Sequence, residues 1–248
     1  MGFFAKLFTK EIKLLPADLS VLNTDIHSHF IPGIDDGSKS MEETLILLKE
    51  FQDFGYKKVI TTPHIMSDLY RNTPEIILNG LAEVKKAAME AGLTIEIEAA
   101  AEYYMDFEFE KLIDEKKLLT FGKNYLLFEL PFIAAPPNLK NAIFKLQTSG
   151  YQPILAHPER YSFWHHKFEN YYELKEKGVL LQLNINSLTG HYSFDTKKTA
   201  ERLIDENMID FFGSDCHNMN HVSLTKRCLT ESYLHKILSY PKLLNKTL

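Results

Sequence analysis

The sequence predicts a single α/β domain folded as a seven-stranded (β/α) barrel, and three observations lead to this fold class. The chain has 248 residues, a length at which single (β/α) barrels are common. Strand-like and helix-like segments alternate seven times without a linker, which favours a parallel sheet. Side chains that can bind metals stand at the end of nearly every predicted strand. A closed barrel brings all strand ends to one mouth, whereas an open sheet gathers ligands only at a switch point, so we favour the barrel.

Turn-forming and capping residues set the bounds of the predicted elements. Ser40 and Glu43 form a capping box before the first helix, and Pro74 and Gly92 favour the start and end of the second. The predicted strands cover residues 21–30, 58–62, 93–99, 125–130, 153–157, 179–185 and 209–215. Four predicted helices cover 41–54, 74–91, 107–117 and 139–149. Three more are predicted: one that ends at residue 178, one that runs through residue 203, and a last one that includes 233–238.

Composition excludes several classes of protein. The net charge of −5 leaves no basic surplus, so we expect no nucleic-acid partner. The two cysteines, Cys216 and Cys228, cannot build a disulfide framework, which fits a cytoplasmic protein. No run of about 18 apolar residues exists, so we expect no transmembrane segment. For residues 1–15 we weigh a weak membrane-surface contact against a helix packed on the domain, and we prefer the packed helix.

The stretch Asp25-Ile26-His27-Ser28-His29 is the first metal-binding pattern in the chain. In a regular strand, Asp25, His27 and His29 would share one face. Two imidazoles on one face at a strand end can reach one divalent cation. Alone, the pattern is equally compatible with a chance arrangement on a surface strand.

Similar residues stand at the end of nearly every other predicted strand, and together they favour a metal site. The set is Asp36 on the first loop and eight residues at strand ends: His27 and His29 (first strand), His64 (second), Glu102 (third), Glu129 (fourth), His157 (fifth), and Asp215 and His217 (seventh). Each residue alone has an ordinary structural explanation, but nine such coincidences at one barrel mouth are improbable. Nine ligands exceed the capacity of one ion, so two to three divalent ions are implied. Mixed imidazole and carboxylate ligands suit Mn²⁺, Fe²⁺ or Zn²⁺.

Clustered divalent ions predict phosphate-ester hydrolysis. Such a site needs a cation for the transferred phosphoryl group, and Arg160 follows His157 by three residues, where its guanidinium could serve. The alternative for Arg160 is a surface salt bridge.

These motifs resemble those of the PHP (polymerase and histidinol phosphatase) hydrolases. The shared patterns are Asp-x-His-x-His, Thr-Pro-His, the lone Glu102, His-Pro-Glu-Arg and Ser-Asp-x-His. The segments 29–37, 130–132, 157–160 and 187–190 are similar to those of bacterial manganese-dependent protein tyrosine phosphatases of capsule and exopolysaccharide loci. The resemblance implies a distorted TIM-like (β/α)₇ barrel of the PHP type at 23–248, preceded by an N-terminal extension at 1–22.

The resemblance also implies a site and a reaction. The first metal would take His27, His29, Glu102 and Asp215, the second Glu102, Glu129 and His157, and the third Asp36, His64 and His217. Manganese is the expected metal, and Glu102 and His217 are expected to act in catalysis as well as ligation. A metal-bridged hydroxide would attack phosphorus while Arg160 stabilises the phosphoryl group. The implied substrate is phosphotyrosine on an autophosphorylating bacterial tyrosine kinase of polysaccharide synthesis.

One departure from the family pattern concerns the phosphate site. An arginine often found shortly after Ser-Asp-x-His is missing, since His221 and Val222 occupy that stretch. Arg71 is a candidate replacement, and the neighbouring Tyr70 is a candidate for the rim that receives a phosphotyrosine ring.

Two further hypotheses concern the class of phosphatase. A small-molecule phosphatase, such as a histidinol-phosphate phosphatase, would use the same metals and remains the alternative. A cysteine-based phosphatase is excluded, because Cys-x₅-Arg would need arginine at the positions of Val222 or Leu234.

Overall fold

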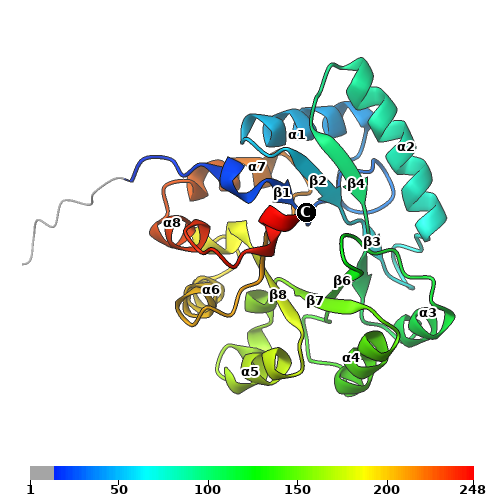
Figure 1. Cartoon of the computed structure of the whole chain (residues 1–248), viewed down its shortest axis with the longest axis vertical. Helices are drawn as coiled ribbons and strands as arrows, with labels where there is room; N and C mark the ends of the chain where they lie inside the picture. The colour runs from blue at the N-terminus through cyan, green and yellow to red at the C-terminus, as the bar shows by residue number, and fades with distance from the viewer. Residues whose placement is uncertain (1–13) are drawn as a thin grey trace, which may run out of the picture.

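The computed structural model describes residues 14–248 (Figure 1). Most of the segment 1–15, for which a packed helix or a membrane-surface contact was considered, lies outside the described residues. Within the described chain, no helix is both long enough and apolar enough to span a bilayer. Leu19 and Leu22, from the predicted extension, are buried in the main hydrophobic core.

All the strand pairs are parallel, and they form two hydrogen-bonded sheets with the orders β1-β2-β4 and β3-β5-β6-β7-β8-β9. The strands are β1 (Thr24–Asp25), β2 (Lys58–Thr61), β3 (His64–Ile65), β4 (Glu96–Ala99), β5 (Glu102–Tyr104), β6 (Tyr125–Glu129), β7 (Gln152–Ala156), β8 (Leu180–Asn184) and β9 (Phe211–Gly213). The predicted strand 58–62 contains only β2, and β3 lies beyond it, after Pro63, which has no backbone N–H to donate. β5 likewise lies beyond the predicted strand 93–99, after Ala100 and Ala101.

The ring of strands closes between the first and the last strand. Ser28 and Cys216 form a parallel bridge there. The backbone N–H of His29 donates to the carbonyl of Cys216 at 2.9 Å, and that of Asp215 donates to the carbonyl of His27 at 2.7 Å. The seven predicted strand–helix units therefore close into a barrel, which confirms the predicted fold class.

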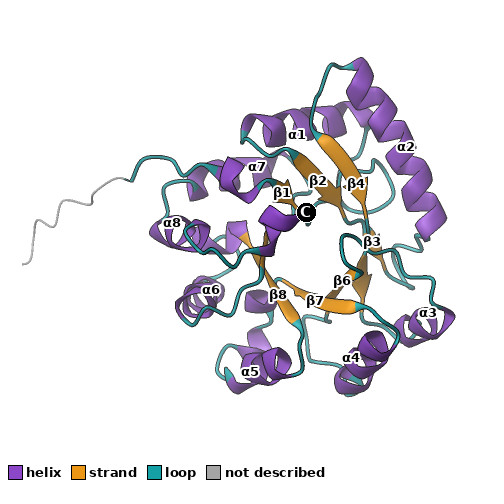
Figure 2. Ribbon diagram, viewed as in Figure 1, coloured by secondary structure: helices purple, strands orange, loops and turns teal. Residues whose placement is uncertain are grey.

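The helices surround the strands (Figure 2). They are α1 (Met41–Asp53), α2 (Pro74–Glu90), α3 (Phe109–Glu115), α4 (Leu139–Thr148), α5 (Glu169–Glu176), α6 (Phe194–Asp205), α7 (Met219–Cys228) and α8 (Ser232–Leu238). Ser40 caps α1 by accepting from the N–H of Glu43, as the capping box predicts. Helix α7 is an addition to the predicted set, and Asn218 caps it by accepting from two backbone N–H groups of its first turn.

The strands bury both faces. Leu126, Phe128 and Leu155 pack in the core that includes the helices. Their neighbours Leu127 and Ile154 belong to a second apolar cluster inside the barrel. Glu129 lies two residues beyond Leu127, so the inward face changes from apolar to ionisable towards the carboxyl ends of the strands. The C-terminal residues Leu244 and Leu248 pack against the inner cluster, and the C-terminus is seen near the centre of the barrel in Figure 1.

Candidate metal centre

The predicted ligands gather in and beneath one cavity at the carboxyl ends of the strands. The cavity has a volume of about 540 Å³. Its lining includes Asp36, His64, Glu102, Glu129, His157, Arg160, Asp215 and His217, together with the side chains of Tyr70, Tyr104, Phe132 and Tyr192. His27 and His29 lie beneath it and are fully buried. The barrel therefore brings strand ends that are far apart in the sequence to a single site.

Three overlapping sets of these side chains have donor atoms within 4.8 Å of one another. The sets are His27, His29, Glu102 and Asp215; His29, Asp36, His64 and His217; and His64, Glu102 and Glu129. The first matches the predicted first ligand set. The second set places His29 beside the three residues predicted for the third metal. The third set places His64 beside Glu102 and Glu129, which were predicted for the second metal.

His157 lies beside the two glutamates that the resemblance pairs with it. Its Nε2 is 3.1 Å from Oε1 of Glu102 and 3.7 Å from Oε2 of Glu129. All nine predicted metal ligands therefore converge on one region of the barrel mouth.

Several of these donor atoms are buried without a hydrogen-bond partner. Among the described residues they include Nε2 of His27, Nε2 of His29, Nδ1 of His64 and Oε2 of Glu102. Buried polar atoms in folded proteins are nearly always satisfied, so a group of orphaned atoms pointing at one another requires an explanation. Nitrogen and carboxylate donors that converge in this way fit divalent transition-metal ions.

His27 and His29 are oriented by two residues that were not predicted to belong to the site. Nδ1 of His27 donates to Oε1 of Gln182, and Nδ1 of His29 donates to Oδ2 of Asp35, both at 2.8 Å. These bonds fix the Nδ1–H tautomer and leave Nε2 free to face a metal. A polar Gln182 within the apolar strand β8 was the available signal in the sequence.

Neighbouring charges shift the pKa values of the ionisable groups in the cluster. Burial raises the pKa of Glu102, but His27 and His64 outweigh it, and the pKa lies well below its ordinary value. Burial lowers the pKa of His29, but Asp35 and Asp215 outweigh it, and the pKa lies well above its ordinary value. The pKa of Asp215 is likewise held well below its ordinary value by His27 and His217 despite burial, whereas burial and the charge of Glu102 raise the pKa of Glu129 well above its ordinary value.

Arg160 lies at the edge of this cluster. Its Nη1 donates to Oδ2 of Asp215 at 2.7 Å, and its side chain is one-fifth exposed to the cavity. Burial and the nearby guanidinium of Arg160 lower the pKa of His157 to about 4. The structure therefore sets a cation next to the ligand cluster, at the position that the sequence analysis expected.

The two other residues predicted to bind substrate, Tyr70 and Arg71, lie in different places. Tyr70 lines the cavity, and its ring stacks on that of His64 at 5.6 Å between centroids. Arg71 instead lines a separate pocket, where its Nε donates to the carbonyl of Ser67 at 2.8 Å. We therefore leave Arg71 out of the proposed site.

The prediction that Asp25 shares one face with His27 and His29 is wrong. Its carboxylate accepts from the backbone N–H and the hydroxyl of Ser214, and burial raises its pKa to about 7. The regular strand β1 ends at Asp25, so alternation does not extend to His27 and His29.

The cysteines do not offer a nucleophile. Cys216 and Cys228 are both buried, and burial raises the pKa of each thiol. This agrees with the exclusion of a cysteine-based phosphatase.

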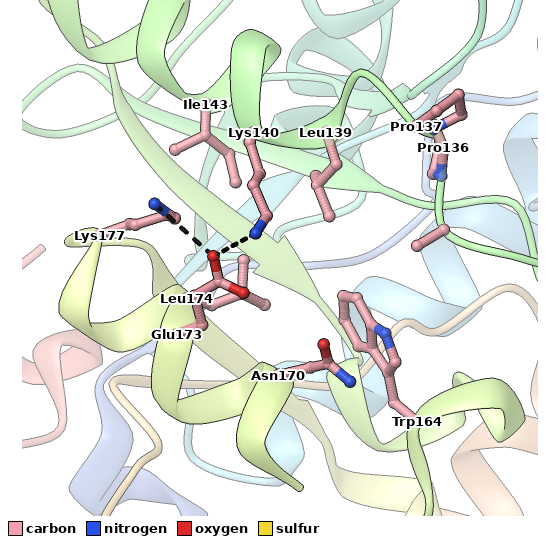
Figure 3. Close-up of a pocket in the computed structure, with 11 residues that line it drawn as sticks. Pro136, Pro137, Leu139, Lys140, Ile143, Trp164, Asn170, Glu173, Leu174 and Lys177 are labelled. Carbon is pink, nitrogen blue, oxygen red and sulfur yellow. Dashed lines mark ion pairs between the residues drawn. The ribbon is translucent and has the colours of Figure 1, made fainter. Parts of the chain in front are cut away.

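A second groove lies on the outer surface between α4 and α5 (Figure 3). It has a volume of about 140 Å³, and Pro136, Pro137 and Trp164 contribute to its wall. Glu173 pairs there with Lys140 at 2.6 Å and with Lys177 at 3.7 Å. None of the metal-ligating sets found in the described chain lies in this groove, so the barrel mouth is the candidate active site.

Comparisons with known proteins agree with this assignment. The chain is 29% identical over 196 residues to the tyrosine-protein phosphatase YwqE of Bacillus subtilis, covering 79% of this chain and 77% of that protein. It is 30% identical over 224 residues to the putative tyrosine-protein phosphatase CapC of Staphylococcus aureus, covering 88% of each.

A solved structure extends the comparison to the fold. The structure comes from a study of YwqE from Bacillus subtilis and CpsB from Streptococcus pneumoniae, which are described as metal-dependent tyrosine phosphatases. It superposes with a TM-score of 0.79 at 26% identity, covering 90% of both chains. Residues 23–236 match the family described as "Capsular polysaccharide synthesis, CpsB/CapC". The chain therefore belongs to the CpsB/CapC family of capsular polysaccharide synthesis.

Proposed function

We propose that the chain is a metal-dependent protein tyrosine phosphatase. The observation that carries the proposal is the position of Arg160 beside three overlapping sets of metal-ligating side chains in one cavity. Clustered divalent ions, with a cation for the phosphoryl oxygens, are an arrangement that can hydrolyse phosphomonoesters. Relatives that span most of the chain are named tyrosine-protein phosphatases, which supports the substrate class.

The nine predicted ligands would hold two to three divalent ions, with Mn²⁺ as the preferred metal and Fe²⁺ or Zn²⁺ as the alternatives. When bound, such ions lower the pKa of a water molecule and neutralise charge on the phosphate oxygens. Glu102 is the best candidate for a bridge between ions, since it belongs to two of the sets and lies beside His157. Nε2 of His217 lies 3.4 Å from Oδ1 of Asp36, and we propose that both residues are metal ligands at the mouth of the cavity.

Residues of the chain would bind the phosphoryl group and the phosphotyrosine ring, and would orient the metal-ligating histidines. The guanidinium of Arg160 would donate hydrogen bonds to the phosphoryl oxygens and stabilise the charge that develops on them. Gln182 and Asp35 keep Nδ1 of His27 and His29 protonated, so that each Nε2 faces the cluster. Tyr70, Tyr104, Phe132 and Tyr192 give the cavity aromatic walls, which suit the ring of a phosphotyrosine side chain.

The proposed physiological substrate is a phosphotyrosine protein, with an autophosphorylating tyrosine kinase of polysaccharide synthesis as the expected partner. The family description, which places the family in capsular polysaccharide synthesis, supports this partner. We also propose a cytoplasmic location, which rests on two free cysteines and can be tested by cell fractionation.

The deciding experiment compares substrates on one preparation. Protein stripped with a chelator and reloaded with Mn²⁺ is assayed on a phosphotyrosine peptide, the same peptide with phosphoserine, and histidinol phosphate. Preference for the phosphotyrosine peptide supports the proposal. Preference for histidinol phosphate would replace it with a small-molecule phosphatase that uses the same cluster.

A further inference from the structure

Arg160 contacts two aromatic rings that come from different loops. Its Cζ lies 4.3 Å from the ring centroid of Tyr192 and 4.9 Å from that of Phe132. Tyr192 lies just before α6, and Phe132 follows β6. Both rings are within the distance at which a guanidinium is attracted to an aromatic face.

The hydroxyl of Tyr192 is tied to the same carboxylate that binds Arg160. The buried Asn184 donates through Nδ2 to Oη of Tyr192 at 3.1 Å and to Oδ2 of Asp215 at 3.0 Å. Oδ2 of Asp215 also accepts from Nη1 of Arg160. A closed set of contacts therefore runs from Tyr192 through Asn184 and Asp215 to Arg160, and from Arg160 back to the ring of Tyr192.

The two aromatic residues differ in their connection to the metal ligands. Phe132 stacks on His157, with 5.8 Å between ring centroids, so replacing it would also disturb a predicted ligand. Within residues 14–248, no hydrogen bond or ring contact joins Tyr192 to a predicted ligand. Tyr192 is thus the residue through which the placement of Arg160 can be changed without touching a ligand directly.

We propose that Tyr192 is a positioning residue of the phosphate site, whose ring, held by Asn184, fixes the guanidinium of Arg160 for the phosphoryl group. An arginine side chain loses considerable rotamer freedom when it is fixed, and a preset orientation reduces that loss upon substrate binding. The inference rests on the proposed phosphatase function, since it assigns Arg160 to the phosphate.

Two substitutions at this position separate the ring from the hydroxyl. Tyr192→Leu removes the ring, and Tyr192→Phe keeps the ring but loses the bond from Asn184. We expect Tyr192→Leu to weaken the binding of inorganic phosphate to the Mn²⁺-loaded protein, and to lower kcat/KM, by about tenfold, the size of a partly desolvated cation–π contact. Tyr192→Phe should recover most of that loss. Calorimetric titration with phosphate measures the affinity independently of turnover.

A matched control and a double-mutant cycle test whether the effect passes through Arg160. Tyr233 is a half-buried tyrosine outside the cavity with a cation, Lys236, over its ring at 5.6 Å. Tyr233→Leu should leave phosphate affinity at the wild-type value. In an Arg160→Ala background, Tyr192→Leu should cause no further loss, because the group that it positions is already gone.

Several results would overturn the inference. They are an unchanged phosphate affinity in Tyr192→Leu, a full and additive loss in the Arg160→Ala background, or a reduced metal content in Tyr192→Leu. If the wild-type protein does not hydrolyse phosphotyrosine, the proposed function fails, but the phosphate titrations still decide whether Tyr192 acts through Arg160.

Discussion

The carboxylate of Asp215 connects Arg160 to the histidine cluster by dividing its two oxygens between them. Oδ2 accepts from Nη1 of Arg160 at 2.7 Å. Oδ1 lies 3.4 Å from Nε2 of His27 and 3.3 Å from Nε2 of His29. One side chain thus sets the spacing between the proposed metal site and the proposed phosphate donor.

This division predicts that phosphate binding and metal binding can be separated at Arg160. Arg160→Ala should lower kcat/KM by about 100- to 1000-fold, the range seen when a donor to a developing oxyanion is removed. Metal content should stay at the wild-type value, because Asn184 still donates to Oδ2 of Asp215. Turnover on a phosphotyrosine peptide and elemental analysis of the same sample measure the two effects.

The control for this substitution is Arg227→Ala, which removes an exposed arginine from the last turn of α7. It should leave both turnover and metal content unchanged. Loss of metal from Arg160→Ala would show that Arg160 supports the ligand cluster rather than the phosphate.

Glu102→Gln should reduce the metal content of the protein. Oε2 of Glu102 lies 3.1 Å from Nε2 of His27 and 3.2 Å from Nδ1 of His64, and Oε1 lies 3.1 Å from Nε2 of His157. An amide keeps the shape but removes the charge that two cations would share, so at least one ion should be lost. The matched control is Glu98→Gln on β4, where the carboxylate pairs with Lys58 at 2.7 Å away from the cluster. Equal metal content in the two variants would contradict the bridging role.

The barrel and the convergence of its strand ends could be predicted from the sequence, because both depend on local patterns. Strand-then-helix alternation requires a parallel sheet, and the carboxyl ends of parallel strands lie on one side. Ligand residues such as His64, Glu129 and His157 could therefore be expected to meet, although they are distant in the chain.

Other features depend on backbone that follows no simple period. His157 and Asp215 both have left-handed backbone conformations, with φ of 34° and 48°. Such residues break the alternation of a strand, so the direction of their side chains cannot be counted from the neighbouring positions. Asp25, which counting placed with His27, bonds to Ser214 instead, because the regular strand β1 ends at Asp25.

Long-range polar contacts also could not be predicted from the sequence. The link from Asn184 to Tyr192 and Asp215 spans separate elements, and only the assembled barrel brings them together. Arg71 shows the converse, since its position next to Tyr70 suggested a role in the cavity, but its side chain turns to the carbonyl of Ser67.

The stability of the metal-free protein should fall as pH rises above neutrality. Burial lowers the pKa values of His27 and His29, but neighbouring carboxylates outweigh it and raise both above the ordinary value of 6.5. A histidine with a raised folded-state pKa contributes stability that is complete below its unfolded pKa and is lost as pH rises through its folded pKa. In the metal-loaded protein the ions replace that positive charge, so this loss should be absent.

Thermal unfolding of chelated and Mn²⁺-loaded protein from about pH 7 to about pH 9 tests this linkage. The Tm of the chelated protein should decline over that range, and the difference between the two forms should widen. Metal binding near pH 7 should also release protons, which titrations in buffers of different ionisation enthalpy can detect. Parallel stability curves with no proton release would show that His27 and His29 are already neutral.

Gly37 should be required for metal binding because the chain passes very close to His29 there. A Cβ added at Gly37 would lie 2.3 Å from the carbonyl oxygen and 2.4 Å from Cβ of His29. The backbone N–H of Gly37 also donates to Asp35 at 3.0 Å, and Asp35 orients the His29 ring. Gly37→Ala should therefore displace the loop that carries Asp35 and Asp36, and should weaken metal binding by about 10- to 100-fold, as loss of a ligand-orienting contact does.

Metal titration of the chelated variant measures this effect. The control is Lys39→Ala, an exposed position two residues further along the same loop, where affinity should not change. Because the clash involves backbone rather than the end of a flexible side chain, a shift of the loop is the only relief available. Wild-type metal affinity in Gly37→Ala would mean that neither Asp35 nor Asp36 needs its present position for the site to bind metal.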